Sequence, residues 1–436
     1  MREIRTLGPA EIEDYLTIYL NAYPAFKTLD DECREEYRQK TKRDMERQED
    51  VDFIGLFEDG TLISTMKIVN FRINLYGTMC PATGLMSLAV HPLHKKQHAA
   101  LDMVRYFEDD ARKKGAAVTV LLPFNMGFYR SLGYGLGAKL DEYHLPTRSL
   151  PAAADLSKLR LLEHGDLPDV LACHSRYAEH THGMIRKFSE EIYDMEQDTA
   201  TRRIGFYREG KLDAYAAYHF VSTSDVNYTM NEIVVDELIY QEPEELRALL
   251  GYFRNQSDEA ETIRIRTGDA EFYHVLRDPQ DLTGNYIPFG YLETNVSAIG
   301  NMYKVVDPER FVRMTSGREF SFHLPAGPCG RAASEEDGLI VRFDYEDEIA
   351  KREDAVSVRF GMDRYGDPAW SVAEEGEEAN VTVRLKKAEL SSLFMNSASL
   401  RSLIALGQAE ISDPAYVGLL DSMLYYWQRP YSNTDF

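Results

Sequence analysis

The hydrophobic pattern of the first 150 residues predicts one amphipathic helix and a mixed sheet. Apolar residues recur at helical spacing over 9–22. Two apolar runs, 52–58 and 62–70, flank a Glu-Asp-Gly sequence that is typical of a tight hairpin turn. The pattern then predicts a strand over 84–90, a loop over 91–96, a helix over 97–114 and a buried strand over 116–124.

A similar order of elements returns in the second part of the chain. Tyr252-Phe253, late in the last predicted helix of this part, repeats the Tyr106-Phe107 pair of the first part. We interpret the two series as a degenerate internal repeat. The second series comprises a strand, a turn and a helix over 160–180, a hairpin over 203–221, and strand, loop, helix and strand over 235–255 and 262–267.

The last third of the chain has a different pattern, which is typical of an α+β domain. A Pro-bounded polar stretch at 145–151 is a candidate linker between the first two parts. The predicted domains are therefore 1–150, 151–304 and 305–436, and three domains also suit a chain of 436 residues. In the third domain, strands are predicted over 338–345, 355–361 and 381–387, and helical segments near 388–407 and 414–427.

Composition limits the class of protein. With 44% hydrophobic and 28% charged residues, the chain has the composition of a soluble globular protein and not of a disordered one. Its net charge of −23 disfavours binding to nucleic acid and to anionic membranes. Two interpretations of this charge remain open, namely general solubility and an acidic cleft for a cationic partner.

The sequence carries no recognisable targeting or metal-binding signal. The N-terminus lacks the apolar core of a secretory signal, and no apolar run reaches the roughly 18 residues of a membrane span. The cysteines and histidines show no metal-ligand spacing, so we predict no metal. The protein is expected to be cytoplasmic, because reduced and widely spaced thiols fit Cys33, Cys80, Cys173 and Cys329.

The loop before the 97–114 helix is a candidate anion site. Lys95 and Lys96 lie where a buried strand ends and a helix begins. The first amides of a helix have no intrahelical acceptors, and the helix dipole places about half a positive charge there. Two lysines in so acidic a chain strengthen this interpretation, although a solvated surface loop would carry the same residues.

A second candidate is the aromatic segment at 128–135, FYRSLGYG, which follows a buried strand. The hydroxyl of Tyr129 could protonate a leaving group, because a tyrosine keeps its proton at pH 7. The alternative is that Phe128 and Tyr129 are core aromatics. Tyr134 is a rival acid, but its position after Gly133 favours packing.

Together, the LAVHPLHKK and FYRSLGYG sequences resemble the GNAT N-acetyltransferases. In that family a bulged strand, a pyrophosphate-binding loop, a helix, a strand and an aromatic segment follow in this order. The repeat, the MYKVVD sequence and the aromatic ending PYSNTDF make the whole chain similar to the Eis (enhanced intracellular survival) family. This resemblance implies a mixed α/β and α+β fold, with two tandem GNAT-like domains and a C-terminal sterol-carrier-protein-like α+β domain.

The resemblance also implies acetyl-CoA as the co-substrate and assigns its contacts. One strand would hold the pantetheine and acetyl groups, the loop and helix start would hold the pyrophosphate, and the next strand would end at the reactive arm. Tyr129 corresponds to the general acid that protonates the departing thiolate. The implied contacts are Leu88, Ala89 and Val90, then Lys95, Lys96, Gln97, His98, Ala99, Ala100 and Leu101, and finally Phe124 and Asn125.

The loop departs from the family pattern Arg/Gln-x-x-Gly-x-Gly/Ala. His98 stands where the family has a glycine that lets the backbone approach the pyrophosphate, and lysine replaces the more frequent arginine. A functional site, a weakened site and a lost site are all compatible with this change. The corresponding loop of the second domain, at 241–245, carries three carboxylates that would repel a pyrophosphate, so we predict that this domain binds no coenzyme.

The resemblance further implies an unusual base and a cationic substrate. The C-terminal carboxylate of Phe436 would deprotonate the amine of an aminoglycoside or of a lysine-type substrate, and Asp435 would bind a substrate ammonium. A homo-oligomer, specifically a hexamer, is implied as well. The alternative function is a non-enzymatic scaffold, or a protein that binds apolar ligands or senses CoA, with a degenerate coenzyme loop.

Overall fold

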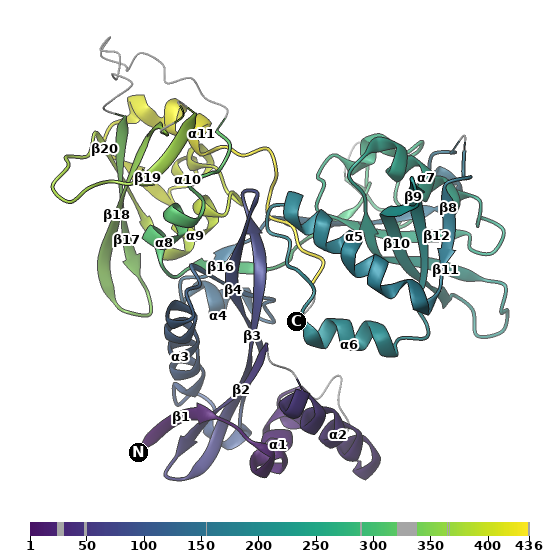
Figure 1. The fold of residues 1–436 in the computed structure, drawn as a ribbon, viewed down its shortest axis with the longest axis horizontal. Helices are drawn as coiled ribbons and strands as arrows, with labels where there is room; N and C mark the ends of the chain where they lie inside the picture. Colours follow the sequence, from purple (N-terminus) through teal and green to yellow (C-terminus); the bar gives the residue numbers. More distant parts are fainter. Residues whose placement is uncertain are drawn as a thin grey trace.

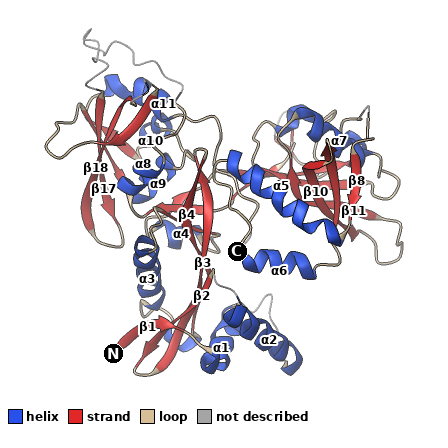
Figure 2. Ribbon diagram, viewed as in Figure 1, coloured by secondary structure: helices blue, strands red, loops and turns tan. Residues whose placement is uncertain are grey.

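The structure is a computed structural model that describes residues 1–23, 30–47, 50–153, 155–287, 290–320, 338–363, 365 and 367–434. Within these residues the chain forms three large sheets, each packed against helices (Figures 1 and 2). The hairpin of β3 (Thr61–Leu75) and β4 (Thr78–Val90) reaches up between the other two sheets (Figure 1). At its tip the Tyr76 amide donates to His182 Nδ1 at 3.1 Å.

The first sheet has helices on both faces. Side chains of β2 and β3 alternate between two apolar cores, so that Phe53 packs toward α1 and the adjacent Ile54 packs toward α3. Helices α1 (Ile12–Ala22) and α2 (Asp31–Arg47) lie on one face, and α3 (Ala99–Lys113) and α4 (Met126–Arg130) on the other. The strands run in the order β1 (Arg2–Thr6), β2 (Val51–Glu58), β3, β4, β5 (Val118–Leu121), β16 (Met302–Val305) and β6 (Gly135–Leu136).

The second sheet repeats this arrangement. Strands β10 and β11 are antiparallel, β11 and β12 are parallel, and the helix between β11 and β12 matches α3 of the first sheet. Its helices are α5 (Leu167–His180), α6 (Ser189–Gln197) and α7 (Pro243–Arg254). The strands run in the order β15 (Val296–Ile299), β7 (Lys139–Pro146), β12 (Thr262–Thr267), β11 (Asn231–Ile239), β10 (Lys211–Ser222), β9 (Arg202–Arg208) and β8 (Leu159–Leu162).

The C-terminal domain is α+β, and Trp370 is buried in its core beside Phe360 and Phe394. Its helices are α8 (Pro308–Met314), α9 (Lys387–Phe394), α10 (Leu400–Ala405) and α11 (Val417–Leu424). A separate short hairpin, β13 (Tyr286–Ile287) and β14 (Tyr291–Leu292), precedes it in the chain. The sheet has the order β19 (Pro368–Val372), β18 (Arg352–Met362), β17 (Leu339–Asp347), β20 (Val381–Lys386) and β21 (Ala409–Ile411).

Two strands lie in a different sheet from their neighbours in the chain. β7 precedes residue 150 but pairs with β12 of the second sheet, and β16, which spans the predicted limit at 304, pairs with β5 of the first. The sheets therefore do not follow the predicted limits of 150 and 304. The stretch at 145–151 is also not an open linker, because it begins inside β7 and buries Thr147 and Leu150.

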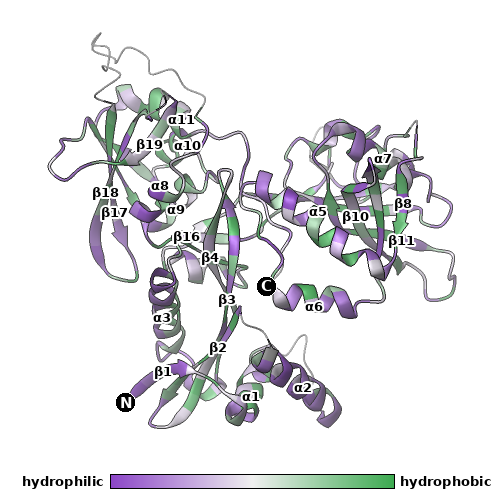
Figure 3. Cartoon of the chain, in the orientation of Figure 1, coloured by the Kyte–Doolittle hydropathy of each residue, from purple (hydrophilic) through white to green (hydrophobic). Residues whose placement is uncertain are grey.

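Hydrophobic periodicity predicted most of the other elements. The structure confirms the amphipathic helix within 9–22, the two hairpins and both strand–loop–helix–strand units, with ends shifted by a few residues. Helix α2 was missed because it is polar along almost its whole length (Figure 3) and has few apolar positions to reveal a period. No helix in the described parts of the chain is long and apolar enough to cross a membrane.

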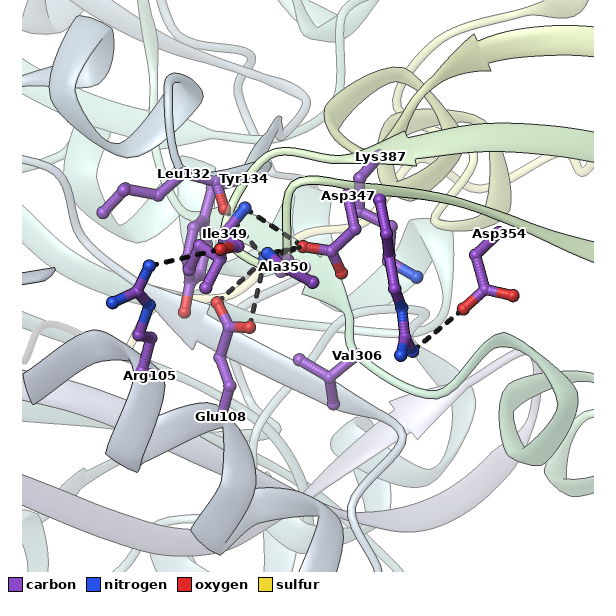
Figure 4. Close-up of polar contacts among 12 residues, drawn as sticks. Arg105, Glu108, Leu132, Tyr134, Val306, Asp347, Ile349, Ala350, Asp354 and Lys387 are labelled. Carbon is purple, nitrogen blue, oxygen red and sulfur yellow. Dashed lines mark hydrogen bonds and ion pairs between the residues drawn. The ribbon is translucent and has the colours of Figure 1, made fainter. Parts of the chain in front are cut away.

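β16 brings a lysine into the junction between the first sheet and the C-terminal domain. Lys304 is fully buried, and its Nζ donates to both oxygens of Glu108 at 3.0 Å and to the Leu132 carbonyl at 2.8 Å. Asp347 lies 3.9 Å from the same nitrogen. Glu108 comes from α3 and Asp347 from β17 (Figure 4), so one ammonium joins two domains.

Lys387 is a second buried lysine at this junction, and it differs from Lys304. Its Nζ lies 4.0 Å from the centre of the Tyr345 ring. Burial lowers the pKa of Lys387 to about 7, and the nearby Asp347 opposes this shift only in part. The unfolded chain thus binds more protons at this residue between pH 7 and its ordinary pKa, and stability from this group rises with pH across that interval.

We predict that Lys387→Met raises the melting temperature at pH 7, because the variant buries no amine. The free energy of unfolding should rise by about 1–3 kcal/mol. The gap between the variant and the natural chain should narrow from pH 7 to pH 9, where the lysine is neutral. Scanning calorimetry at both pH values measures it, and Lys386→Met, at the exposed neighbouring position, is the control. A gap independent of pH would contradict the prediction.

Candidate active site

Strand β4 changes its geometry near its C-terminal end. Its register against β3 slips between Thr65 and Lys67, which face Ala89 and Met86. Between these two partners Ser87 adopts a φ of 54°. This is a β-bulge, which bends a strand and redirects the groups that follow it.

The bulge separates β4 from β5. The two strands pair only between residues 83–85 and 119–121, and residues 86–90 have no partner strand on that side among the described residues. Two hydroxyls donate to carbonyls of this segment, since Tyr23 donates to the Leu88 carbonyl at 3.1 Å and Ser64 donates to the Ala89 carbonyl at 2.7 Å. The backbone groups that point away from β3 can therefore bind a ligand.

A cavity of about 610 Å³ opens between this edge and the N-terminus of α3. Its volume is typical of sites for small molecules and cofactors. Every residue that the sequence analysis assigned to the coenzyme lines this cavity except Gln97, whose carbonyl accepts a hydrogen bond from Arg2 at 2.8 Å. The lining consists of Ala22, Tyr23, Leu88, Ala89, Val90, His94, Lys95, Lys96, His98, Ala99, Ala100, Leu101, Phe124, Asn125 and Phe128.

Helix α3 begins at this cavity. Its first intrahelical hydrogen bond runs from the Asp102 amide to the His98 carbonyl at 3.0 Å, so the amides of Ala99, Ala100 and Leu101 have no intrahelical acceptor. His98 precedes them with a φ of 63°, in the left-handed region that favours glycine. The backbone thus has a conformation that glycine adopts readily, while an exposed imidazole lies at the cavity wall.

The cavity is cationic although the chain as a whole is acidic. No carboxylate lines it in the part of the chain that the structure describes. Lys95 and Lys96 are exposed and have no ion-pair partner among the described residues. Asp102, in the first turn of α3, is neutralised by Arg2 at 2.6 Å. The local charge therefore suits an anionic ligand.

Tyr129 lies in α4, against two residues of the cavity wall. Its ring centre is 5.8 Å from that of Phe124 and 5.0 Å from that of Phe128. Tyr129 does not itself line the cavity, and 3% of its surface is exposed. Burial raises the pKa of its hydroxyl above the ordinary value, so the phenol keeps its proton at neutral pH.

Tyr134 has a different environment. It is fully buried, and its hydroxyl accepts a hydrogen bond from Thr119 at 3.3 Å. By contrast, the Tyr129 hydroxyl has no hydrogen-bond partner among the residues with a described position. Of the two tyrosines of the FYRSLGYG segment, Tyr129 is thus the one that packs against the cavity wall with a hydroxyl that has no partner among the described residues.

Sequence reasoning missed Ala22, Tyr23, His94 and Phe128 as parts of the cavity wall. Tyr23 directly follows α1, far in the chain from β4, and only packing brings it to Leu88. The signal that could have found it is the spacing of Tyr15, Tyr19 and Tyr23, because residues four apart lie on one face of a helix. That aromatic face packs against the first sheet.

In the second domain, the corresponding loop at 241–245 is occupied by the side chain of Glu245. Glu245 is buried, and its Oε2 accepts hydrogen bonds from the Gln241 amide at 2.9 Å and the Glu242 amide at 3.0 Å. Its other oxygen pairs with Arg208 at 3.0 Å. The amides at this loop are therefore engaged by a carboxylate of the protein.

The two predicted residues at the chain end, Asp435 and Phe436, lie outside the described residues, as does Cys329. Among the described residues no group of His, Cys, Asp and Glu side chains could hold a metal ion. His182, two residues after the end of α5 at His180, has a structural role, because its Nε2 lies 3.0 Å from the Met395 carbonyl.

Comparison with protein families agrees with this architecture. Residues 3–137 match one family model described as an acetyltransferase (GNAT) domain, and residues 183–293 match another with the same description. The two matches together span more than half of the chain. The chain belongs to the GNAT acetyltransferases. This is a family of acyltransferase enzymes that use acetyl-CoA as a co-substrate, and both GNAT domains of the chain lie in the sheets described above.

Solved structures share the fold over the entire chain. Eis1 from Mycobacterium abscessus is 18% identical with a TM-score of 0.75, and each chain is covered to 100%. A GCN5-related N-acetyltransferase from Anabaena variabilis is 12% identical with a TM-score of 0.76, and a probable N-acyltransferase from Enterococcus faecalis is 15% identical with 0.74, again with 100% of each chain covered. A sequence comparison with curated proteins found no match. The sterol-carrier-like character of the third domain stays a prediction.

We predict that the double variant Lys95→Gln/Lys96→Gln binds CoA about tenfold more weakly, because two charges are lost beside the helix terminus. The loss should shrink as salt is added, since exposed charges are screened. Isothermal calorimetry at low and high salt measures both effects. Lys113→Gln, at the opposite end of α3, is the matched control. Equal affinity of the double variant and the natural chain would contradict a pyrophosphate site at this loop.

Proposed function

We propose that this protein transfers the acetyl group of acetyl-CoA to an amine of a cationic, polyamine-like substrate, such as an aminoglycoside or a lysine-type amine. The observation that carries the proposal is the cavity of about 610 Å³, which combines a free strand edge, a helix N-terminus and two unpaired lysines. A nucleotide-linked thioester needs these three elements, because it has an extended amide-bearing arm and a pyrophosphate.

Each element has a part in binding. The amides of Ala99, Ala100 and Leu101, with the ammonium groups of Lys95 and Lys96, hold the pyrophosphate. The edge formed by Leu88, Ala89 and Val90 pairs with the amides of the pantetheine arm and orients the thioester. Phe124 and Asn125 limit the cavity at the reactive end, where Asn125 also accepts a hydrogen bond from the Phe128 amide at 2.9 Å and so fixes the start of α4.

Tyr129 acts as the general acid. The substrate nitrogen attacks the thioester carbonyl, the new C–N bond forms, and the C–S bond breaks. The Tyr129 hydroxyl gives its proton to the departing sulfur, so that CoA leaves as a thiol. The raised pKa of this hydroxyl keeps the phenol protonated at neutral pH, so that it has a proton to give as the C–S bond breaks.

The C-terminal carboxylate of Phe436 takes the proton from the attacking amine, and Asp435 binds a second ammonium of the substrate. A free α-carboxyl has an ordinary pKa of about 3.5, which is low for a base at neutral pH. Burial of the carboxylate, or a water molecule between it and the amine, allows it to act. The overall acidity of the chain supports a substrate with several positive charges.

The direct test is release of CoA thiol from acetyl-CoA with a panel of polyamines and aminoglycosides. We expect turnover with at least one polycationic amine, and Tyr129→Phe should lower kcat by a factor of about 10²–10⁴ with little change in CoA affinity. Tyr134→Phe is the matched control, since its hydroxyl bonds only inside the core, and it should retain kcat. If the natural chain releases no thiol with any amine of the panel, the proposed function is wrong. A near-normal kcat in Tyr129→Phe would contradict the role of Tyr129 as the general acid.

A second test concerns the base. Two glycines added after Phe436 move the terminal carboxylate by up to about 7 Å without changing any existing side chain. We expect kcat to fall at least tenfold while CoA binding, measured by calorimetry, stays unchanged. Unchanged turnover in the extended chain would contradict the terminal carboxylate as the base.

A further inference from the structure

The last described residues of the chain follow a defined path between domains. After α11, residues 425–434 leave the C-terminal domain and reach the second domain (Figure 1). The Asn396 side chain donates to the Tyr426 carbonyl at 2.9 Å and to the Gln428 carbonyl at 2.7 Å. The Gln428 side chain in turn bonds to the backbone of His180 and His182, at 3.0 and 2.8 Å.

Two glycines make room for this tail. A Cβ at Gly183, which has a φ of 85°, would lie 2.8 Å from the Pro430 Cα and from the Tyr431 amide nitrogen. A Cβ at Gly268 would lie 2.5 Å from the Tyr431 ring. Side chains at either position would collide with the tail, so the loops of the second domain are shaped for close contact with it.

Asn433 ends this path in a polar site of the second domain. Its Nδ2 donates to Glu237 Oε1 at 3.0 Å, and its Oδ1 lies 3.3 Å from His174 Nε2. His174 is buried, and burial lowers its pKa to about 4, so the imidazole is neutral at pH 7 and can donate one N–H to the amide oxygen. Both the NH₂ group and the oxygen of the Asn433 side chain thus have a hydrogen-bond partner in the second domain.

The Glu237 carboxyl group, which accepts the hydrogen bond from Asn433, is held in its ionised form. Burial disfavours the charge of Glu237, but the Lys187 ammonium at 2.5 Å and the Tyr215 hydroxyl at 2.6 Å hold its pKa at about 2. Lys187 also pairs with Glu191 at 3.1 Å. The polar groups around Asn433 therefore come from α5, α6, β10, β11 and the segment before α6, and they offer both an acceptor and a donor to its side-chain amide.

The site lies at a specific place in the repeat. β11 is the counterpart of β4, because each pairs in parallel with the strand that follows its helix, and each has a bulged register against the preceding strand. Just past the bulge, Glu237 faces Ala217 as Ala89 faces Thr65. The strand position that lines the cavity in the first GNAT domain thus binds the tail in the second.

We propose that the second GNAT domain is a binding site for the chain's own C-terminal tail, with Asn433 as the recognised residue, and that this contact sets where the chain terminus acts. The catalytic part of this inference rests on the proposed function. Thr434 is 2% exposed, and two further residues reach at most about 7 Å beyond it whatever their path. Asn433 is thus a positioning residue that acts through the terminus.

The first experiment measures the contact without any turnover. Carboxypeptidase is added to the natural chain and to Asn433→Leu, and mass spectrometry follows the removal of terminal residues. We expect trimming of the variant to be roughly ten- to a hundredfold faster, because a hydrogen bond to a charged group is lost. Tyr425→Phe, which removes an exposed hydroxyl from the start of the same tail, is the matched control and should be trimmed like the natural chain. Equal trimming of Asn433→Leu and the natural chain would overturn the inference.

The second variant, Asn433→Asp, adds a pH readout that a general loss of stability would not produce. When protonated, the new carboxyl can still donate to Glu237, and when ionised it is repelled by it. The contact should therefore be present in acid and be lost as pH rises through the pKa of the new group. Trimming relative to the natural chain should be faster at pH 8 than at pH 5. This comparison decides the question if Asn433→Leu does not fold, and equal ratios at the two pH values overturn the inference.

The catalytic consequence is read from kinetics with the substrate found in the amine panel. We expect Asn433→Leu to lower kcat at least tenfold while the KM for acetyl-CoA stays near the natural value. Faster trimming with unchanged kcat would overturn the positioning role. If the natural chain releases no thiol, the proposed function fails, while the trimming experiment still decides whether the second domain binds the tail.

Discussion

The architecture depends on one strand that lies far in the sequence from the strands it joins. β16 follows the whole second domain in the chain, yet it pairs with both β5 and β6 of the first sheet. Its Lys304 is fully buried, so its charge must be balanced, and Glu108 and Asp347 balance it from two different domains. Separating the C-terminal domain would take Asp347 away and leave Glu108 as the only one of these two carboxylates beside the buried ammonium, and a buried charge that loses a partner destabilises a folded protein.

This junction also supports the segment that carries the proposed acid. Lys304 donates to the Leu132 carbonyl, three residues after Tyr129, in the turn that follows α4. Gly133 completes the turn with a φ of 86°, and a Cβ there would lie 2.7 Å from a Glu348 oxygen. The C-terminal domain therefore packs against the turn that follows α4. Through this contact it supports the position of Tyr129.

The two GNAT domains show how one fold takes two roles through a few side chains. At the start of α3, the amides are free and two lysines stand beside them, whereas at the start of α7 Glu245 occupies the loop amides itself. The counterpart strands β4 and β11 differ in a similar way. Ala89 of β4 lines the cavity, whereas Glu237 of β11 binds Asn433. A small residue leaves room for a ligand, and a charged residue with a fixed partner fills the space.

The sequence alone determined what depends on near neighbours in the chain. Periodicity and the Asp-Gly turn identified most helices and strands and the internal repeat, and the resemblance to the GNAT family named most of the residues that line the cavity, because residues within one strand–loop–helix unit lie together in any packing. Only the tertiary structure decided the exchange of β7 and β16 between sheets, the place of Tyr23 and the path of residues 425–434. These features join residues dozens to hundreds of positions apart, and their energy comes from buried charge and close packing that no local pattern records.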